Sequence, residues 1–85
     1  MKKLVSFYLI CTLSFFLSCN GNKINASDVP KPTIDAFTAK YPGATDIGWI
    51  TEKKGDKTIY EAKFKFIGKE IEAEFNADGT FIQED

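Results

Sequence analysis

The chain has 85 residues and a formal net charge of −1, from 11 lysines and arginines against 12 aspartates and glutamates. This balance lacks the basic excess by which proteins bind nucleic acids. No histidine is present, which removes the usual general base of nucleophilic catalysis, and a chain of this length has room for one small domain.

Residues 1–18 have the composition of a bacterial signal peptide. Lys2 and Lys3 precede an apolar run over residues 4–17, which is shorter than the about 20 apolar residues of a membrane-spanning helix. The stretch Phe16-Leu17-Ser18-Cys19 resembles a lipobox, in which the cysteine receives a lipid before cleavage. We therefore expect a lipoprotein anchored through Cys19 on the periplasmic side of a bacterial membrane.

Two alternatives stay open for this leader. Cleavage after Ala26 would give ordinary secretion to the periplasm, and a retained helical anchor would leave the leader in place. If the protein is lipidated, neither of its two cysteines is free to form a disulfide, because Cys11 leaves with the leader and Cys19 carries lipid. The mature domain is then expected to have no disulfide and to be held together by packing alone.

Residues 19–29 are rich in Asn, Gly, Lys and Ser and have no apolar period, which predicts a flexible tether after the lipidated cysteine. The folded domain is expected to occupy residues 30–85. Its first element is a helix, with Pro30 and Pro32 in the first turn and Ser27 or Asp28 as a cap. Three apolar residues follow at helical spacing before Pro42-Gly43 ends the helix: Ile34, Phe37 and Tyr41.

Four strands are predicted after the helix, over residues 46–52, 59–67, 69–75 and 80–83. In the first, Ile47 and Trp49 point to one side and Ile50 to the other. The second and third alternate strictly between apolar and charged residues around a tight turn at Ile67-Gly68. The register that this turn implies pairs Phe64 with Ile71, Ala62 with Ala73, Tyr60 with Phe75, Lys65 with Glu70 and Lys63 with Glu72.

These elements predict an α+β fold, in which one N-terminal helix packs on a four-stranded antiparallel β-sheet. The sheet face away from the helix is expected to be mostly charged, with a few apolar residues among the charges. Such residues are either incidental or part of a contact surface. The candidates for a partner surface are Ile50, Ile59, Ile67 and Ile82.

Seven short motifs run through residues 29–79: Val29-Pro30, Ile34-Asp35-Ala36-Phe37, Lys40-Tyr41-Pro42-Gly43-Ala44, Trp49, Tyr60-Glu61-Ala62, Gly68-Lys69-Glu70 and Phe75-Asn76-Ala77-Asp78-Gly79. Together they resemble the PepSY-like domains of bacterial secreted proteins and lipoproteins, also described as β-lactamase-inhibitor-like. The resemblance implies a helix on a four-stranded sheet and a binding or inhibitory role. It carries over no functional residue, and Ile67 stands where the family often has a turn-forming Asn or Asp.

The remaining chemistry favours binding over catalysis. Ser27 is the one serine after residue 18, and with no histidine the usual nucleophile and base pairs cannot be assembled. Glu70, Glu72 and Glu74 line one strand face, but Lys63 and Lys65 are expected opposite two of them. We interpret this face as solvated and salt-bridged, and expect no metal and no cofactor.

The sequence thus predicts a non-catalytic periplasmic lipoprotein that binds an envelope protein or a peptide, with an inhibitory or regulatory effect. The alternative is a structural domain that self-associates as a homodimer. Under either hypothesis, its partners are a membrane through Cys19 and a protein or peptide, and not a nucleic acid.

Overall fold

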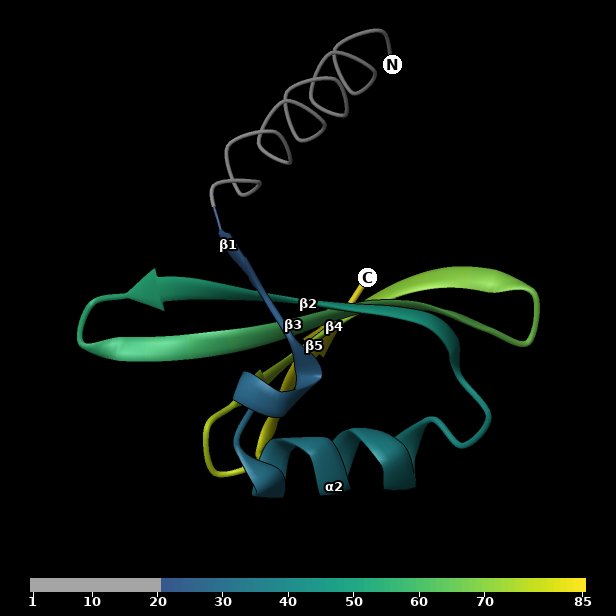
Figure 1. Ribbon diagram of the computed structural model, residues 1–85, viewed down its shortest axis with the longest axis horizontal. Coiled ribbons are helices and arrows are strands. Elements are labelled where there is room, and N and C mark those ends of the chain that lie inside the picture. The colour runs from purple at the N-terminus through teal and green to yellow at the C-terminus, as the bar shows by residue number, and fades with distance from the viewer. Residues whose placement is uncertain (1–20) are drawn as a thin grey trace, which may run out of the picture.

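A computed structural model describes residues 21–85 of the chain. Five strands form one antiparallel sheet in the order β1-β2-β3-β4-β5, and the helix α2 covers one of its faces (Figure 1). The predicted leader and Cys19 lie outside the described residues. The elements in chain order are β1 (Asn22–Ile24), the 3-10 helix η2 (Ala26–Asp28), α2 (Lys31–Lys40), β2 (Thr45–Lys54), β3 (Lys57–Phe66), β4 (Lys69–Asn76) and β5 (Phe81–Glu84).

The predicted α+β fold with a four-stranded sheet is wrong, because residues 21–85 form a predominantly β architecture of five strands with one short helix. The additional strand, β1, comes from the segment expected to be a tether. Its three residues pair with Thr51, Ile50 and Trp49 of β2. The pairing with β1 satisfies backbone N–H and C=O groups along part of the ten-residue β2. The polar composition of the segment that forms β1 does not predict this pairing.

The helix itself is confirmed close to its predicted position. Pro30 is its N-cap and Pro32 occupies the first turn, where a missing backbone N–H costs nothing. Ser27 and Asp28, expected as caps, instead belong to η2, which turns the chain between β1 and α2. This turn places Val29 in the core.

The β3–β4 hairpin has the register that the sequence predicts, from Phe66 opposite Lys69 to Tyr60 opposite Phe75. Its two turn residues, Ile67 and Gly68, both have positive φ, of 51° and 77°. A β-branched side chain is strained in that region, so the predicted pairing holds despite an unfavourable turn residue.

Phe37 is the centre of the core between α2 and the sheet. Its ring centroid lies 4.9 Å from that of Phe64, 5.3 Å from Trp49 and 5.6 Å from Tyr41, with tilted or edge-on geometry. Phe75, which is completely buried, lies 6.3 Å away. These are the residues that the sequence predicts as core, and they show that the apolar side of the sheet faces α2.

Two polar bonds join α2 to the far end of the chain. The hydroxyl of Thr33, which is completely buried, donates to the carbonyl oxygen of Asn76 at 2.8 Å. The hydroxyl of Tyr41 donates to the carboxylate of Glu84 on β5. The short last strand is therefore tied to the helix as well as to β4.

Replacing Thr33 by Val tests the first of these bonds, since the two side chains have nearly the same shape. The carbonyl of Asn76 still accepts the amide of Gly79 at 3.0 Å, so we expect a loss of about 1 kcal/mol in the free energy of unfolding. Urea denaturation measures it, with Thr38→Val on the exposed side of the same helix as the control. Equal effects of the two substitutions would contradict this role for Thr33.

Candidate functional site

The four isoleucines predicted as a partner surface do not form one patch. Ile59 is only 4% exposed, so it is unavailable for contact. Ile67 is 85% exposed at the β3–β4 turn, and Ile82 is partly exposed on the edge strand β5. Ile50 is half-buried on β2 and lines a hollow there. Only Ile50 therefore belongs to the site that the fold creates.

That site lies where β2 extends past the end of β1. The strand β1 pairs with β2 only from Trp49 to Thr51. Among the described residues, the part of β2 from Thr45 to Gly48 has no strand paired with it on the side of β1. On its other side, the pairing of β2 with β3 shifts register between Thr45 and Gly48. Asp46, inside this irregular stretch, has a φ of 53°. The result is a bent strand with a free edge.

Two hollows lie beside this free edge and share Gly48, Trp49, Ile24 and Asn25. We call them together the Gly48 groove. The outer hollow, of about 580 Å³, has Lys23, Asp46, Ile50 and Lys63 in its lining. The inner hollow, of about 350 Å³ on the helix side, has Ile34, Phe37, Thr38 and Ile47 in its lining.

Gly48 keeps the outer hollow open. A β-carbon built on this residue would meet no atom within 4 Å, and its φ lies outside the positive region that demands glycine. Glycine inside a strand weakens the strand and often marks a bulge or a place where a ligand or another backbone approaches closely. The register shift between Thr45 and Gly48 is one physical reason for this glycine, and the open space beside it also leaves room for an approaching ligand.

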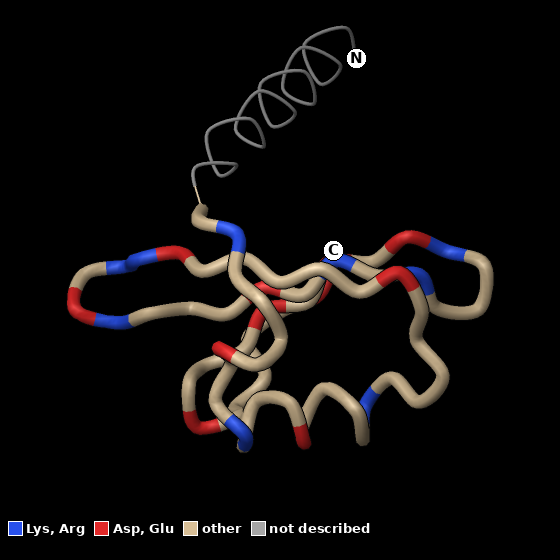
Figure 2. Tube along the Cα trace, in the orientation of Figure 1, with Lys and Arg blue, Asp and Glu red and all other residues tan. Residues whose placement is uncertain are grey.

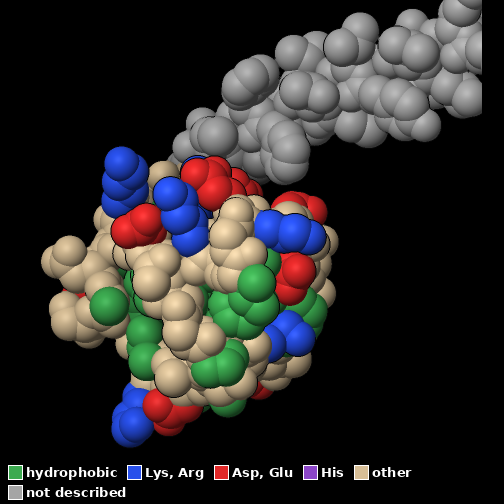
Figure 3. Space-filling model, turned by 90° about the vertical axis from the view of Figure 1, so that its right-hand side faces the viewer, with side chains coloured by type: hydrophobic (Ala, Val, Ile, Leu, Met, Phe, Trp, Pro, Cys, Tyr) green, Lys and Arg blue, Asp and Glu red, His purple; other side chains and the backbone are tan. Residues whose placement is uncertain are grey.

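The groove combines apolar and charged groups. Ile47 is 45% exposed beside the buried Trp49, whereas Lys23 and Lys63 contribute positive charge and Asp46 contributes negative charge. Figure 3 shows a comparable mixture on one end of the molecule, where hydrophobic side chains lie open between charged ones. Such a lining suits a polypeptide better than a purely ionic or purely apolar ligand.

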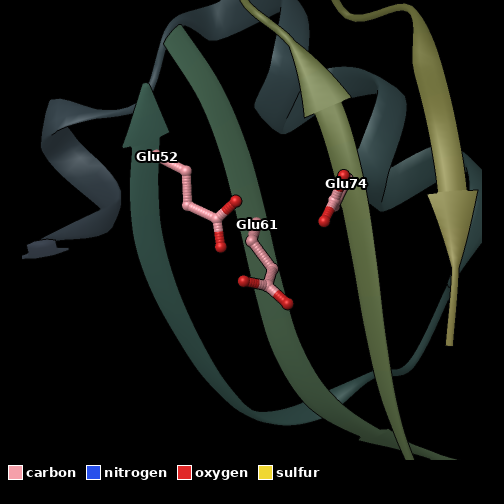
Figure 4. A group of neighbouring side chains, drawn as sticks. All are labelled: Glu52, Glu61 and Glu74. Atoms are coloured by element: carbon pink, nitrogen blue, oxygen red, sulfur yellow. The ribbon is translucent and has the colours of Figure 1, made fainter. Parts of the chain in front are cut away.

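A second feature lies on the sheet face opposite α2, where three glutamates come together from three adjacent strands (Figure 4). One carboxylate oxygen from each of Glu52, Glu61 and Glu74 lies within 4.8 Å of the others. Glu61 is 8% exposed and Glu74 is 9% exposed. In Figure 2 acidic positions also occur in the middle of the sheet, away from the hairpin ends.

Burial and mutual repulsion shift the acidity of this group. Desolvation by burial, a hydrogen bond with the Glu72 side chain and the charges of Glu72, Glu52 and Glu74 raise the pKa of Glu61 to about 8. The pKa of Glu74 is also raised, chiefly by desolvation and in spite of the nearby positive charge of Lys54. Within residues 21–85, none of Glu52, Glu61 and Glu74 forms a salt bridge.

The expected salt-bridged face is only partly present. Lys63 pairs with Glu72 at 3.7 Å, but Lys65 pairs with Asp46 at 3.8 Å instead of with Glu70. The sequence alone did not predict the glutamate cluster, because only the lysine–glutamate pairs of the predicted hairpin were expected to determine the charge of this face. Its signal was available, since the predicted register places Glu61 directly opposite Glu74, a like-charge pair that is normally unfavourable.

Comparison of the chain with protein-family models, with curated proteins and with solved structures gave no match. The resemblance to PepSY-like domains therefore stays a prediction. Within residues 21–85, no helix is long and apolar enough to cross a membrane.

The raised pKa of Glu61 predicts how stability depends on pH. Below about 4.5 this carboxyl is protonated in both states, whereas between about 4.5 and about 8 only the folded state keeps the proton. In buffer free of divalent cations, the free energy of unfolding should therefore fall as the pH rises through this range.

Urea denaturation across this range checks the prediction with two matched variants. Glu61→Gln has no charge to gain and should show a smaller fall, whereas Glu70→Gln, at an exposed position of the next strand, should behave as the wild type. The same fall in all three proteins would contradict the assignment to Glu61.

Proposed function

We propose that the chain is a non-catalytic binding module, anchored on the periplasmic side of a bacterial membrane, that holds an extended segment of an envelope protein or peptide in the Gly48 groove. The observation that carries the proposal is a strand glycine beside a free strand edge, with open space on the side where a β-carbon would lie. Occupation of the groove would inhibit or regulate the bound protein.

The free edge of β2 supplies the first element of recognition. Its backbone N–H and C=O groups on the side of β1 can pair with an added strand, which gives affinity independent of sequence. Successive side chains of an extended segment point to opposite sides. The two hollows lie on the outer side and on the helix side of this edge, so they match that alternation and supply specificity.

The start of β1 limits how far the domain can lie from its anchor. If Cys19 carries lipid, only Asn20 and Gly21 separate it from Asn22, the first residue of β1. The linker from Cys19 to Asn22 spans about 10 Å when fully extended. Gly21 itself lies tightly against β2, since an added β-carbon would collide with Ile50 and Thr51. The groove would then lie close to the membrane surface, which favours a partner that is itself held in the envelope.

Self-association is a second candidate function, supported by the other edge of the sheet. The strand β5 is an edge strand, on which Phe81 is 39% and Ile82 is 38% exposed. Two copies could pair through these edges. The buried position of Ile59 means that a charge there would unfold the chain, so Ile82 is the suitable position for disrupting such a dimer.

Site-specific photo-crosslinking in intact cells separates the two candidates. A photoreactive side chain at Ile47, inside the groove, should capture a second polypeptide, whereas the same side chain at Lys57 in the distant β2–β3 hairpin should not. Gly48→Leu fills the outer hollow and should remove the adduct, and Lys57→Leu serves as the matched control. Adducts of the chain with itself alone would favour the homodimer, and an adduct unaffected by Gly48→Leu would contradict binding in the groove.

A further inference from the structure

We propose that Glu52, Glu61 and Glu74 form a binding site for one divalent cation of the size of Ca²⁺, on the sheet face opposite α2. The site is separate from the groove proposed to bind a polypeptide, and the experiments below test it independently of that proposal. Two observations carry it: the mutual distances of three carboxylates, and an unsatisfied buried oxygen within the same group.

The distances fit one ion of this size. Ca²⁺ binds oxygen ligands at 2.3–2.6 Å, so two ligands on opposite sides of it lie at most about 5 Å apart. One oxygen from each of the three glutamates lies within 4.8 Å of the others, so all three can reach a common ion without movement of the strands. Mg²⁺ needs ligands at about 2.0–2.1 Å and close to octahedral, and would require the carboxylates to move closer.

The second observation is an oxygen without a partner. Glu74 is more than nine-tenths buried, and its Oε1 has no hydrogen-bond partner among residues 21–85. A buried carboxylate oxygen that remains unpaired costs substantial free energy. Its own carboxylate belongs to the three-glutamate group, so a cation bound there would compensate for the lost hydration.

The neighbouring cations leave this position open. Lys63 projects from the same strand as Glu61 but pairs with Glu72, at 3.7 Å. Lys54 acts on Glu74 electrostatically, without a salt bridge between them in the described part of the chain. Figure 4 shows the three glutamates on three neighbouring strands, β2, β3 and β4.

The ion would bridge three neighbouring strands whose glutamate side chains repel one another on this face. Each glutamate belongs to a different strand, so the bound ion favours the folded sheet over the unfolded chain. Calcium should therefore raise the midpoint of thermal unfolding, and this effect can be read without any knowledge of the chain's partner.

Calorimetric titration of the purified, chelator-treated chain with CaCl₂ and then with MgCl₂ tests the site. We expect one Ca²⁺ per chain with an affinity in the range of extracellular modules, about 10⁻⁴–10⁻³ M, weaker Mg²⁺ binding, and a higher midpoint of unfolding with Ca²⁺. Glu61→Gln should weaken Ca²⁺ binding at least about tenfold, whereas Glu70→Gln on the exposed part of β4 should bind as the wild type.

Two further measurements keep the test decisive if Glu61→Gln fails to fold. Glu52→Gln, at a half-buried position, removes a ligand with less effect on packing. Amide chemical shifts of the wild-type chain should change with CaCl₂ around residues 52, 61 and 74 and remain constant in α2. No heat and no shift of the midpoint up to about 10 mM CaCl₂ would overturn the proposal. Equal binding by the wild type and by both ligand variants would overturn it as well.

Discussion

The packing of one aromatic ring, Phe37, against one face of the sheet is the interaction on which the remaining structure depends. The described domain is small, and this layer is its main apolar core. Because the ring packs against Trp49 of β2, Phe64 of β3 and Phe75 of β4, it fixes which face of these three strands is buried. Among residues 21–85 no second α-helix packs on the opposite face, and three of its glutamates lie close to one another.

Both candidate sites follow from this one-sided arrangement. The bend in β2 between Thr45 and Gly48 leads the strand out of the α2–β2 connection into the sheet, and β1 is too short to cover that part of it. On the face opposite α2, strand pairing brings three glutamates together. The groove therefore results from incomplete pairing at the edge of the sheet, and the acidic cluster from the register of β2, β3 and β4.

The sequence predicted the elements whose signals are local and repeated. Strict alternation on β3 and β4 gave their register, and helical spacing gave Phe37 and Tyr41 as core. It did not predict β1, because a three-residue strand in a polar segment has no periodicity of its own. The register shift beside Gly48 was not predicted either, although a glycine inside a strand often marks such an irregularity.

The central claim is that Gly48 is kept for a ligand at the expense of stability, and Gly48→Val tests it most directly. Glycine in a strand costs about 0.5–1 kcal/mol relative to other residues, and a β-carbon here meets open space. The account predicts that urea denaturation of the free chain shows Gly48→Val to be more stable than the wild type by about that amount. A clear loss of stability would show that the space around Gly48 is needed by the fold itself and would contradict the account.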